Sequence, residues 1–277
     1  MPETAIFLLD NGSLQPEAVF ALRRLAGQVS SETGYHVEPV SLLHSNKIPT
    51  EHLNGSPAEI FSGALTRQYR AGIRRFLVAP LFFGPSGAII RYLPERIRAF
   101  QEKLGPFTVH IVPWLASLKG NGNTRIAGML ADGVVSTMQG LVRPSVVLVD
   151  HGSPEAEVSE VRNHLAMLLR KRLGDRVQGV VAASMERRSG SEYDFNEPLL
   201  ARALDNPEME DQAIVVAMQF LLPGRHAGPG GDVAAICAEA KQRHPRQSTY
   251  MTPLVAGHPA LVGLLADRIR GGLQADW

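Results

Sequence analysis

The sequence predicts an α/β protein made of two tandem, duplicated domains, each a parallel sheet between two helical layers, with an interdomain cleft. Short apolar runs alternate with longer amphipathic stretches along all 277 residues. The apolar runs are rich in Val, Ile, Leu and Phe without alternation, which is typical of parallel strands covered on both faces. The same order of runs then starts again near the middle of the chain, which indicates a duplication.

Four apolar runs of the first half predict strands, and the amphipathic stretches between them predict helices. The strands are expected in AIFLLD (5–10), HVEPVSLL (36–43), RFLVAPLFF (75–83) and TVHIV (108–112). The helices are expected at 16–33, 57–72 and 89–104.

The second half repeats this order. Strands are expected in SVVLVD (145–150), VQGVVAAS (177–184), AIVVAMQF (213–220) and STYM (248–251). Helices are expected at 157–173, 198–204 and 232–243, with a last helix from His258.

The two halves align by their motifs. AIFLLDNGS matches VVLVDHGS, so Asn11 corresponds to His151, and FFGPSGA matches FLLPGRH, so Ala88 corresponds to His226. A repeat of this length predicts two copies of one domain, at residues 1–140 and 145–277.

Composition excludes several classes of function. Lys and Arg (28) balance Asp and Glu (27), which argues against nucleic-acid binding because such proteins carry a basic excess. The single cysteine, Cys237, allows no internal disulfide, as in a reducing cytoplasm. The N-terminal apolar run is too short for a signal peptide or a membrane span. We therefore expect a cytoplasmic monomer or homodimer with no membrane partner.

Polar side chains follow the predicted strands of the second half. His151, Glu186, His226 and His258 each lie after a different strand, and the carboxyl ends of parallel strands form the ligand-binding edge. We expect His258 to cap or pack at the start of the last helix. Two imidazoles and a carboxylate suit Co²⁺, Fe²⁺, Ni²⁺ or Zn²⁺, and three ligands leave coordination positions open. The two positions equivalent to the site histidines hold Asn11 and Ala88, so only the second half is expected to carry this site.

Three motifs resemble those of the class II chelatases, the sirohydrochlorin cobaltochelatases and ferrochelatases of cobalamin and sirohaem synthesis. They are VVLVDHGSP, FLLPGRHAGPGGDVAAIC and TPLVAGHPALVGLLADRI. The resemblance implies a metal chelatase, a lyase, that inserts Co²⁺, Fe²⁺ or Ni²⁺ as a substrate into sirohydrochlorin or a related tetrapyrrole and keeps no permanent cofactor. The family's metal-binding histidines correspond to His151 and His226. Its active-site glutamate corresponds to Glu186, with Glu192 and Glu197 as alternatives.

The catalytic residues implied are thus His151, Glu186 and His226. Arg187, Arg188 and Arg225 adjoin them in the sequence and are candidates to bind the substrate's carboxylates. The first half departs from the family pattern, with Asn11 in its NGS motif, and with Ala88 and Tyr92 where a histidine and an aspartate would suit. A non-catalytic tetrapyrrole or metal carrier derived from a chelatase is the alternative function.

Overall fold

The computed structural model describes residues 3–118 and 122–277 and confirms the predicted α/β class. The chain forms two compact units: Met1–Leu115 with Pro259–Trp277, and Ala116–His258. Each unit contains one four-stranded sheet in which every neighbouring pair of strands is parallel. No helix within the described residues is long and apolar enough to cross a membrane.

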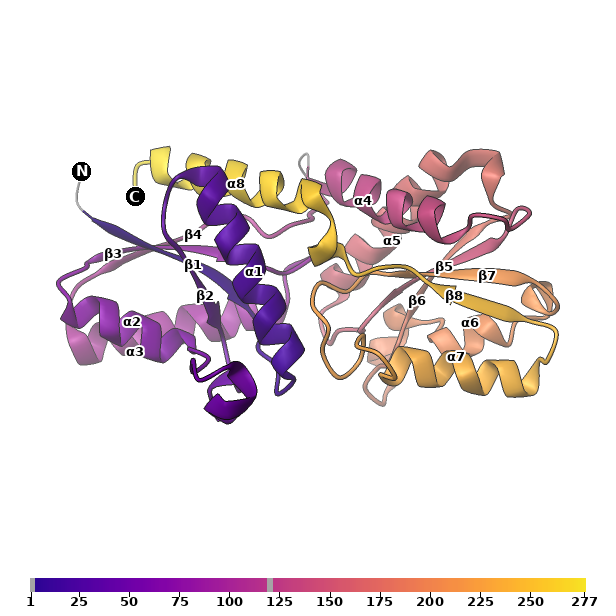
Figure 1. Cartoon of the computed structure of the whole chain (residues 1–277), viewed down its shortest axis with the longest axis horizontal. Helices are drawn as coiled ribbons and strands as arrows, with labels where there is room; N and C mark the ends of the chain where they lie inside the picture. The colour runs from indigo at the N-terminus through magenta and orange to yellow at the C-terminus, as the bar shows by residue number, and fades with distance from the viewer. Residues whose placement is uncertain (1–2, 119–121) are drawn as a thin grey trace. The chain divides into compact units, whose positions relative to one another are not determined.

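The first unit has the strand order β2–β1–β3–β4. Its strands are β1 (Thr4–Asp10), β2 (Val37–Ser41), β3 (Arg75–Pro80) and β4 (Thr108–Ile111). Its helices are α1 (Pro16–Thr33), α2 (Phe61–Arg70), α3 (Leu93–Leu104) and α8 (Pro259–Gln274). In Figure 1, α2 and α3 cover one face of this sheet and α8 lies over the other, where it packs against α1 and β3.

The second unit repeats this arrangement with the order β6–β5–β7–β8. Its strands are β5 (Ser145–Asp150), β6 (Val180–Ser184), β7 (Ala213–Met218) and β8 (Ser248–Met251). Its helices are α4 (Gly122–Thr137), α5 (Ala156–Leu173), α6 (Leu200–Leu204) and α7 (Asp232–Arg243). Helices α4 and α5 lie on one face of the sheet, and α6 and α7 lie on the other (Figure 1).

The lengths of corresponding elements support the duplication. Helices α1 and α5 have 18 residues each, α3 and α7 have 12, and α8 and α4 have 16. The central strands β1 and β5 are buried on both faces, as their unbroken apolar sequences predict. Their side chains lie in two hydrophobic cores, one around Phe7, Phe61 and Phe76 and one around Val147, Leu200 and Val216.

The compact units divide the chain differently from the sequence repeat at 1–140 and 145–277. Helix α4 lies within the first copy of the repeat but packs on α5 and β7, whereas the last helix, α8, packs on α1 and β3. Helix α4 was not expected from the sequence, because Gly122, Gly128 and Gly133 lower its intrinsic helix propensity. Its buried face, which includes Ile126 and Leu130, stabilises it through packing instead.

The helix expected at 89–104 begins differently. A π-helical turn occupies Ala88–Tyr92, and α3 starts at Leu93. Pro94 explains the change, because it has no N–H to donate to the preceding turn.

Candidate metal-binding site

The candidate site lies at the carboxyl edge of the second sheet. His151 follows β5, Glu186 follows β6 by two residues, and His226 lies in the loop between β7 and α7. Strand β5 lies between β6 and β7 in the sheet, so these three loops are neighbours in space. All three residues belong to the same compact unit.

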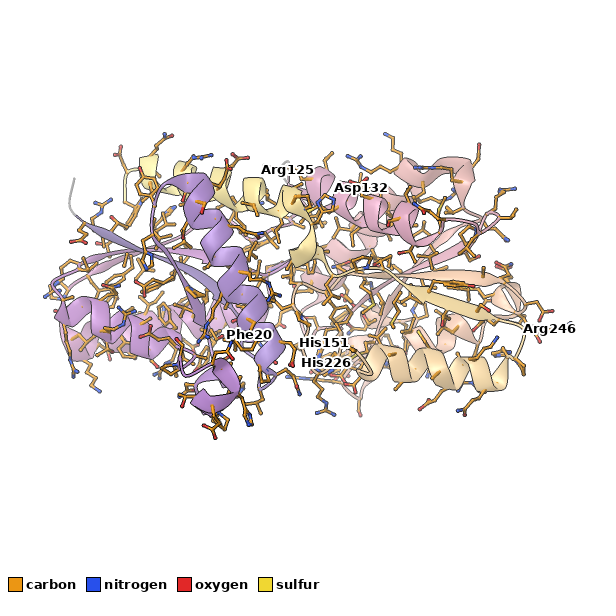
Figure 2. All side chains as sticks on the ribbon, in the orientation of Figure 1. Phe20, Arg125, Asp132, His151, His226 and Arg246 are labelled. Atoms are coloured by element: carbon orange, nitrogen blue, oxygen red, sulfur yellow. The ribbon has the colours of Figure 1, made fainter. Side chains whose placement is uncertain are left out.

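The side chains of His151 and His226 lie next to each other (Figure 2), with their rings in an edge-on arrangement. Their Nε2 atoms are 3.3 Å apart, and the ring centroids are 4.5 Å apart with the planes at 71°. The carboxylate of Glu186 completes the group, with Oε1 3.4 Å from Nε2 of His151. The side chains of His151 and Glu186 are 47% and 59% exposed, so solvent reaches the group.

Hydrogen bonds on the far side of each ring determine which nitrogen carries the proton. Nδ1 of His226 lies 2.6 Å from Oδ2 of Asp232, and Nδ1 of His151 lies 3.1 Å from the carbonyl oxygen of Gly152. Both partners are acceptors, so each neutral ring is assigned the Nδ1–H tautomer. Both Nε2 atoms then present lone pairs to each other, beside a carboxylate oxygen that is also an acceptor.

This cluster of acceptors matches the spacing that one metal ion requires. Metal–imidazole bonds of about 2.1 Å at a tetrahedral angle separate the two nitrogens by about 3.4 Å. The observed 3.3 Å agrees with that value. Within residues 3–118 and 122–277, no group of three His, Cys, Asp or Glu side chains has the geometry of a metal site. The candidate metal ligands are therefore the two imidazoles, and the carboxylate of Glu186 lies next to the imidazole of His151.

A glycine brings the loops of β5 and β6 together. Gly152 has φ +93°, and a Cβ atom there would lie 1.9 Å from the carbonyl oxygen of Glu186. The amide of Glu186 donates to the carbonyl of His151 at 3.2 Å, which sets the two site residues side by side. The first unit has the same turn at Gly12, with φ +93° and the carbonyl of Leu43 at 1.8 Å from the equivalent Cβ.

The loop that carries His226 folds back on itself before α7. Gly228 donates to the carbonyl of Gly224 at 2.8 Å, and Val233 donates to the carbonyl of His226 at 3.1 Å. A Cβ on Gly231 would lie 2.5 Å from the carbonyl oxygen of Arg225. This close backbone packing brings Asp232, the first residue of α7, against the imidazole of His226.

A buried ion pair lies directly beneath the turn of His151. Asp150 is 5% exposed, and its Oδ1 accepts hydrogen bonds from the Gly152 amide at 3.1 Å and from the Ser184 hydroxyl at 2.7 Å. Nη1 of Arg162, which is 1% exposed, lies 3.7 Å from the same oxygen. Burial raises the pKa of Asp150, and the positive charge of Arg162 opposes that shift.

The other predicted residues lie around this centre. Glu197 forms ion pairs with Arg187 and Arg202 at 2.8 Å and 3.2 Å, and Arg187 also binds Asp194 at 3.0 Å. Of the three candidate glutamates, Glu186 is the one whose carboxylate contacts a site imidazole among the described residues.

Two of the three candidate arginines remain largely accessible. Arg188 is exposed, with its guanidinium 5.9 Å from the ring centroid of Tyr193. The side chain of Arg225 is 78% exposed and lies 3.6 Å from Asp232. His258 does not join the site, because its Nε2 lies 3.3 Å from the carboxylate of Asp132.

Sequence reasoning did not single out Asp232, Asp150 or Arg162 as site residues. A signal for Asp232 was available, since an acidic residue at a helix start, six positions after His226, is placed to reach the imidazole. Arg162 lies in the middle of an amphipathic helix, where an arginine predicts a solvated side chain. The burial of Arg162 results from tertiary packing, which the helical sequence pattern does not indicate.

The second copy of the repeat matches a protein-family model. Residues 145–271 match the family model CbiX, which confirms the resemblance to class II chelatases that the motifs predict. This match covers the second copy of the repeat, which carries the histidine pair. Among curated proteins, no sequence matches the chain significantly.

Solved structures of chelatases share the fold over nearly the whole chain. SirB from Bacillus subtilis with Fe³⁺ matches at 15% identity and a TM-score of 0.70, covering 99% of this chain and 96% of SirB. SirB from Bacillus subtilis subspecies spizizenii, a sirohydrochlorin chelatase in complex with cobalt, matches at 15% and 0.69, covering 98% and 95%. CbiX, the terminal enzyme for sirohaem biosynthesis in denitrifying bacteria, matches at 16% and 0.62, covering 98% and 100%.

Proposed function

We propose, from the match of residues 145–271 to the CbiX family model, that the protein is a chelatase that inserts a divalent metal ion into a sirohydrochlorin-type tetrapyrrole. The observation that carries the proposal is the pair of Nε2 lone pairs at 3.3 Å, each fixed by an acceptor on the opposite side of its ring. Two acceptors at this distance repel each other unless a proton or a metal ion lies between them. A pair of imidazoles beside a carboxylate suits a divalent metal ion, and we propose that the metal takes this place.

The proposed reaction exchanges two pyrrole protons for one metal ion. His151 and His226 bind the partly dehydrated ion through their Nε2 atoms and leave its other coordination positions open for the macrocycle. As the pyrrole nitrogens take the metal, the two imidazole bonds break and the site returns to its starting state. The products are the metallated tetrapyrrole and two protons.

Glu186 is proposed as the acceptor of a pyrrole proton. Its carboxylate lies 3.4 Å from Nε2 of His151 and is more than half exposed, so it is within reach of a bound macrocycle and can pass the proton to water. While the metal is bound, its negative charge also offsets part of the ion's positive charge.

Arg188 and Arg225 are proposed to bind carboxylates of the tetrapyrrole. Both guanidinium groups are accessible at the margin of the site. Arg187 is proposed to contribute less, because its guanidinium is engaged by Glu197, Asp194 and the carbonyl of Gly190.

Among the similar proteins, one SirB structure contains Fe³⁺ and another contains cobalt. We propose Co²⁺ or Fe²⁺ as the metal substrate, with Ni²⁺ as a further candidate, because all three accept nitrogen and oxygen donors.

The test is an anaerobic absorbance assay of the purified protein with sirohydrochlorin and each metal in turn. The proposal predicts metal-dependent turnover that falls at least 100-fold in His151→Ala and in His226→Ala. The matched control is His244→Ala, which removes an imidazole of the same unit that binds Asp205 instead, and it is expected to retain wild-type rates.

The same assay separates the enzyme from the carrier. Binding of one equivalent of tetrapyrrole or metal without multiple turnovers would support the carrier. Rates unchanged in both histidine variants would reject the assigned site.

A further inference from the structure

One buried arginine joins three segments of the candidate site. Arg162 extends from α5 and is 1% exposed. Its Nη1 atom donates to the Ser184 hydroxyl at the end of β6 and to the carbonyl of Asn196 at 3.1 Å, and it lies 3.7 Å from Asp150 at the end of β5. Nη2 donates to the carbonyl of Phe195 at 3.2 Å.

Asn196 extends this network to the turn itself. Its side-chain oxygen accepts from the amide of Ser153 at 2.9 Å, and its side-chain nitrogen donates to the carbonyl of Ser153 at 2.9 Å. The turn His151–Gly152–Ser153 is therefore held at both ends: Asp150 binds the amide of Gly152, and Asn196 binds both backbone groups of Ser153. Arg162 contacts both of these anchors.

The other copy of the repeat supplies an internal comparison. The sequence offset of 140 places Leu22 opposite Arg162 and Asp10 opposite Asp150, and both copies keep the turn glycine. Ser45 there binds the backbone of Ser13, as Asn196 binds that of Ser153. The copy with Asn11 in place of His151 thus retains the turn and its anchors. Arg23 of α1 donates there to the carbonyls of Ser56 and Pro57 at 2.7 Å and 3.0 Å, as Arg162 donates to those of Phe195 and Asn196. Among the described residues, the contact between an arginine and the buried carboxylate is made in the second copy, by Arg162 and Asp150.

Asp10 and Asp150 differ in their charged neighbours. Each has one buried carboxylate oxygen that accepts no hydrogen bond from any described residue, Oδ1 of Asp10 and Oδ2 of Asp150. Burial raises the pKa of Asp10 to about 6 and also raises that of Asp150, where the charge of Arg162 opposes the shift. The turn at Gly12 forms without an arginine beside its carboxylate, so formation of the turn does not by itself account for the contact between Arg162 and Asp150.

We propose that Arg162 is a positioning residue that fixes the turn of His151 and the end of β6, and with them His151 and Glu186, for metal binding. The consequence for catalysis rests on the proposed chelatase function, but the effect on the turn does not. A rigid guanidinium with several donors in one plane can bind groups of three chain segments at once, which neither leucine nor an ammonium group can do. Removing it leaves the turn anchored by separate contacts, and the two Nε2 atoms then hold their 3.3 Å spacing for a smaller fraction of the time.

The experiment compares two variants with wild type. Arg162→Leu combined with Asp150→Asn removes both charges, so no unpaired charge is buried, and the amide keeps an acceptor for the Gly152 amide. Arg162→Lys keeps the charge but loses the planar fork. The matched control is Asp10→Asn, which changes the corresponding carboxyl in the copy without imidazoles.

Three readouts are measured: amide hydrogen exchange at Gly152 and Ser153 by NMR, Co²⁺ affinity from its visible absorption bands, and KM for the metal against KM for the tetrapyrrole. We expect the double variant to melt cooperatively, to exchange these amides at least tenfold faster and to bind Co²⁺ at least tenfold more weakly. KM for the tetrapyrrole should stay within twofold. Arg162→Lys should show an intermediate loss, and Asp10→Asn should match wild type in all three readouts.

Wild-type exchange and Co²⁺ affinity in the folded double variant would overturn the inference and leave Arg162 a core-filling residue. If the double variant does not fold, Arg162→Lys decides, and wild-type values in that variant would overturn it equally. A wild-type protein without turnover, combined with faster exchange in the variants, would reject the chelatase function and leave the positioning role in place.

Discussion

We expect the carboxylate of Asp232 to control how strongly His226 binds a metal, because it accepts the hydrogen bond of the imidazole Nδ1. Asp232→Asn replaces a charged acceptor, 2.6 Å from Nδ1 of His226, with a neutral amide of the same size. If the amide oxygen faces Nδ1, the hydrogen bond is weaker and the imidazole is a poorer donor. If the amide nitrogen faces Nδ1, the ring proton moves to Nε2 and blocks the metal-binding position. Both orientations weaken metal binding.

The contact geometry gives the size of the effect. A hydrogen bond to a charged group contributes about 1.5–3 kcal/mol when it is well shielded. The side chains of His226 and Asp232 are 32% and 40% exposed, so we take the lower end of that range, about 1.5 kcal/mol, which corresponds to roughly tenfold in affinity. Loss of a carboxylate behind a metal-binding histidine costs about 10–100-fold in other metal sites, which agrees with this value.

The assay is a Co²⁺ titration of the variant at fixed pH and salt. The matched control is Glu157→Gln, which removes an exposed carboxylate from the first turn of α5 in the same unit. We expect Asp232→Asn to bind Co²⁺ about tenfold more weakly than wild type and the control to bind it with wild-type affinity. An Asp232→Asn affinity within twofold of wild type would refute the reasoning. An equal loss in the control would assign the effect to net charge instead.

Two further predictions concern the turns and the buried carboxyl of the first unit. Gly152→Ala and Gly12→Ala should each lower the free energy of unfolding by about 3 kcal/mol or more in urea titrations, because a Cβ would lie within 2 Å of a carbonyl oxygen. Only Gly152→Ala should also weaken Co²⁺ binding, and equal binding losses in both variants would contradict the assigned site. Asp10 has a pKa raised from 3.8 to about 6 by burial, so its contribution to stability is complete below pH 4 and is lost as the pH rises through 6. Asp10→Asn should therefore be more stable than wild type at pH 8 by up to about 3 kcal/mol, a difference that disappears near pH 4 in thermal melts. A difference that does not change with pH would show that burial of the charge is not its cause.

The sequence predicted most of the fold because its strands are buried on both faces. Runs such as SVVLVD are apolar throughout, and β5 occupies the same six residues. Helix α4 could not be predicted, because its three glycines oppose helix formation and only its packing on α5 and β7 compensates. The packing of α8 on β3 could not be predicted either, because the apolar pattern of a helix does not indicate which sheet the helix covers.

The part of the candidate site that could be predicted from the sequence is the set of residues that directly follow parallel strands. His151, Glu186 and His226 were expected at one edge because each follows a parallel strand, and the structure brings their side chains together. The roles of Asp232 and Arg162 depend on side-chain directions that strand order does not give. Arg162 is buried beneath α5, although an arginine in the sequence of an amphipathic helix is normally expected on its solvated face.

Anomalous diffraction at the cobalt absorption edge, from crystals grown with Co²⁺, tests the central claim most directly. We expect a cobalt ion about 2.1 Å from Nε2 of both His151 and His226, with Nδ1 of His226 still bound to Asp232. A cobalt ion bound to only one of these imidazoles, or bound elsewhere while both rings keep their present positions, would contradict it.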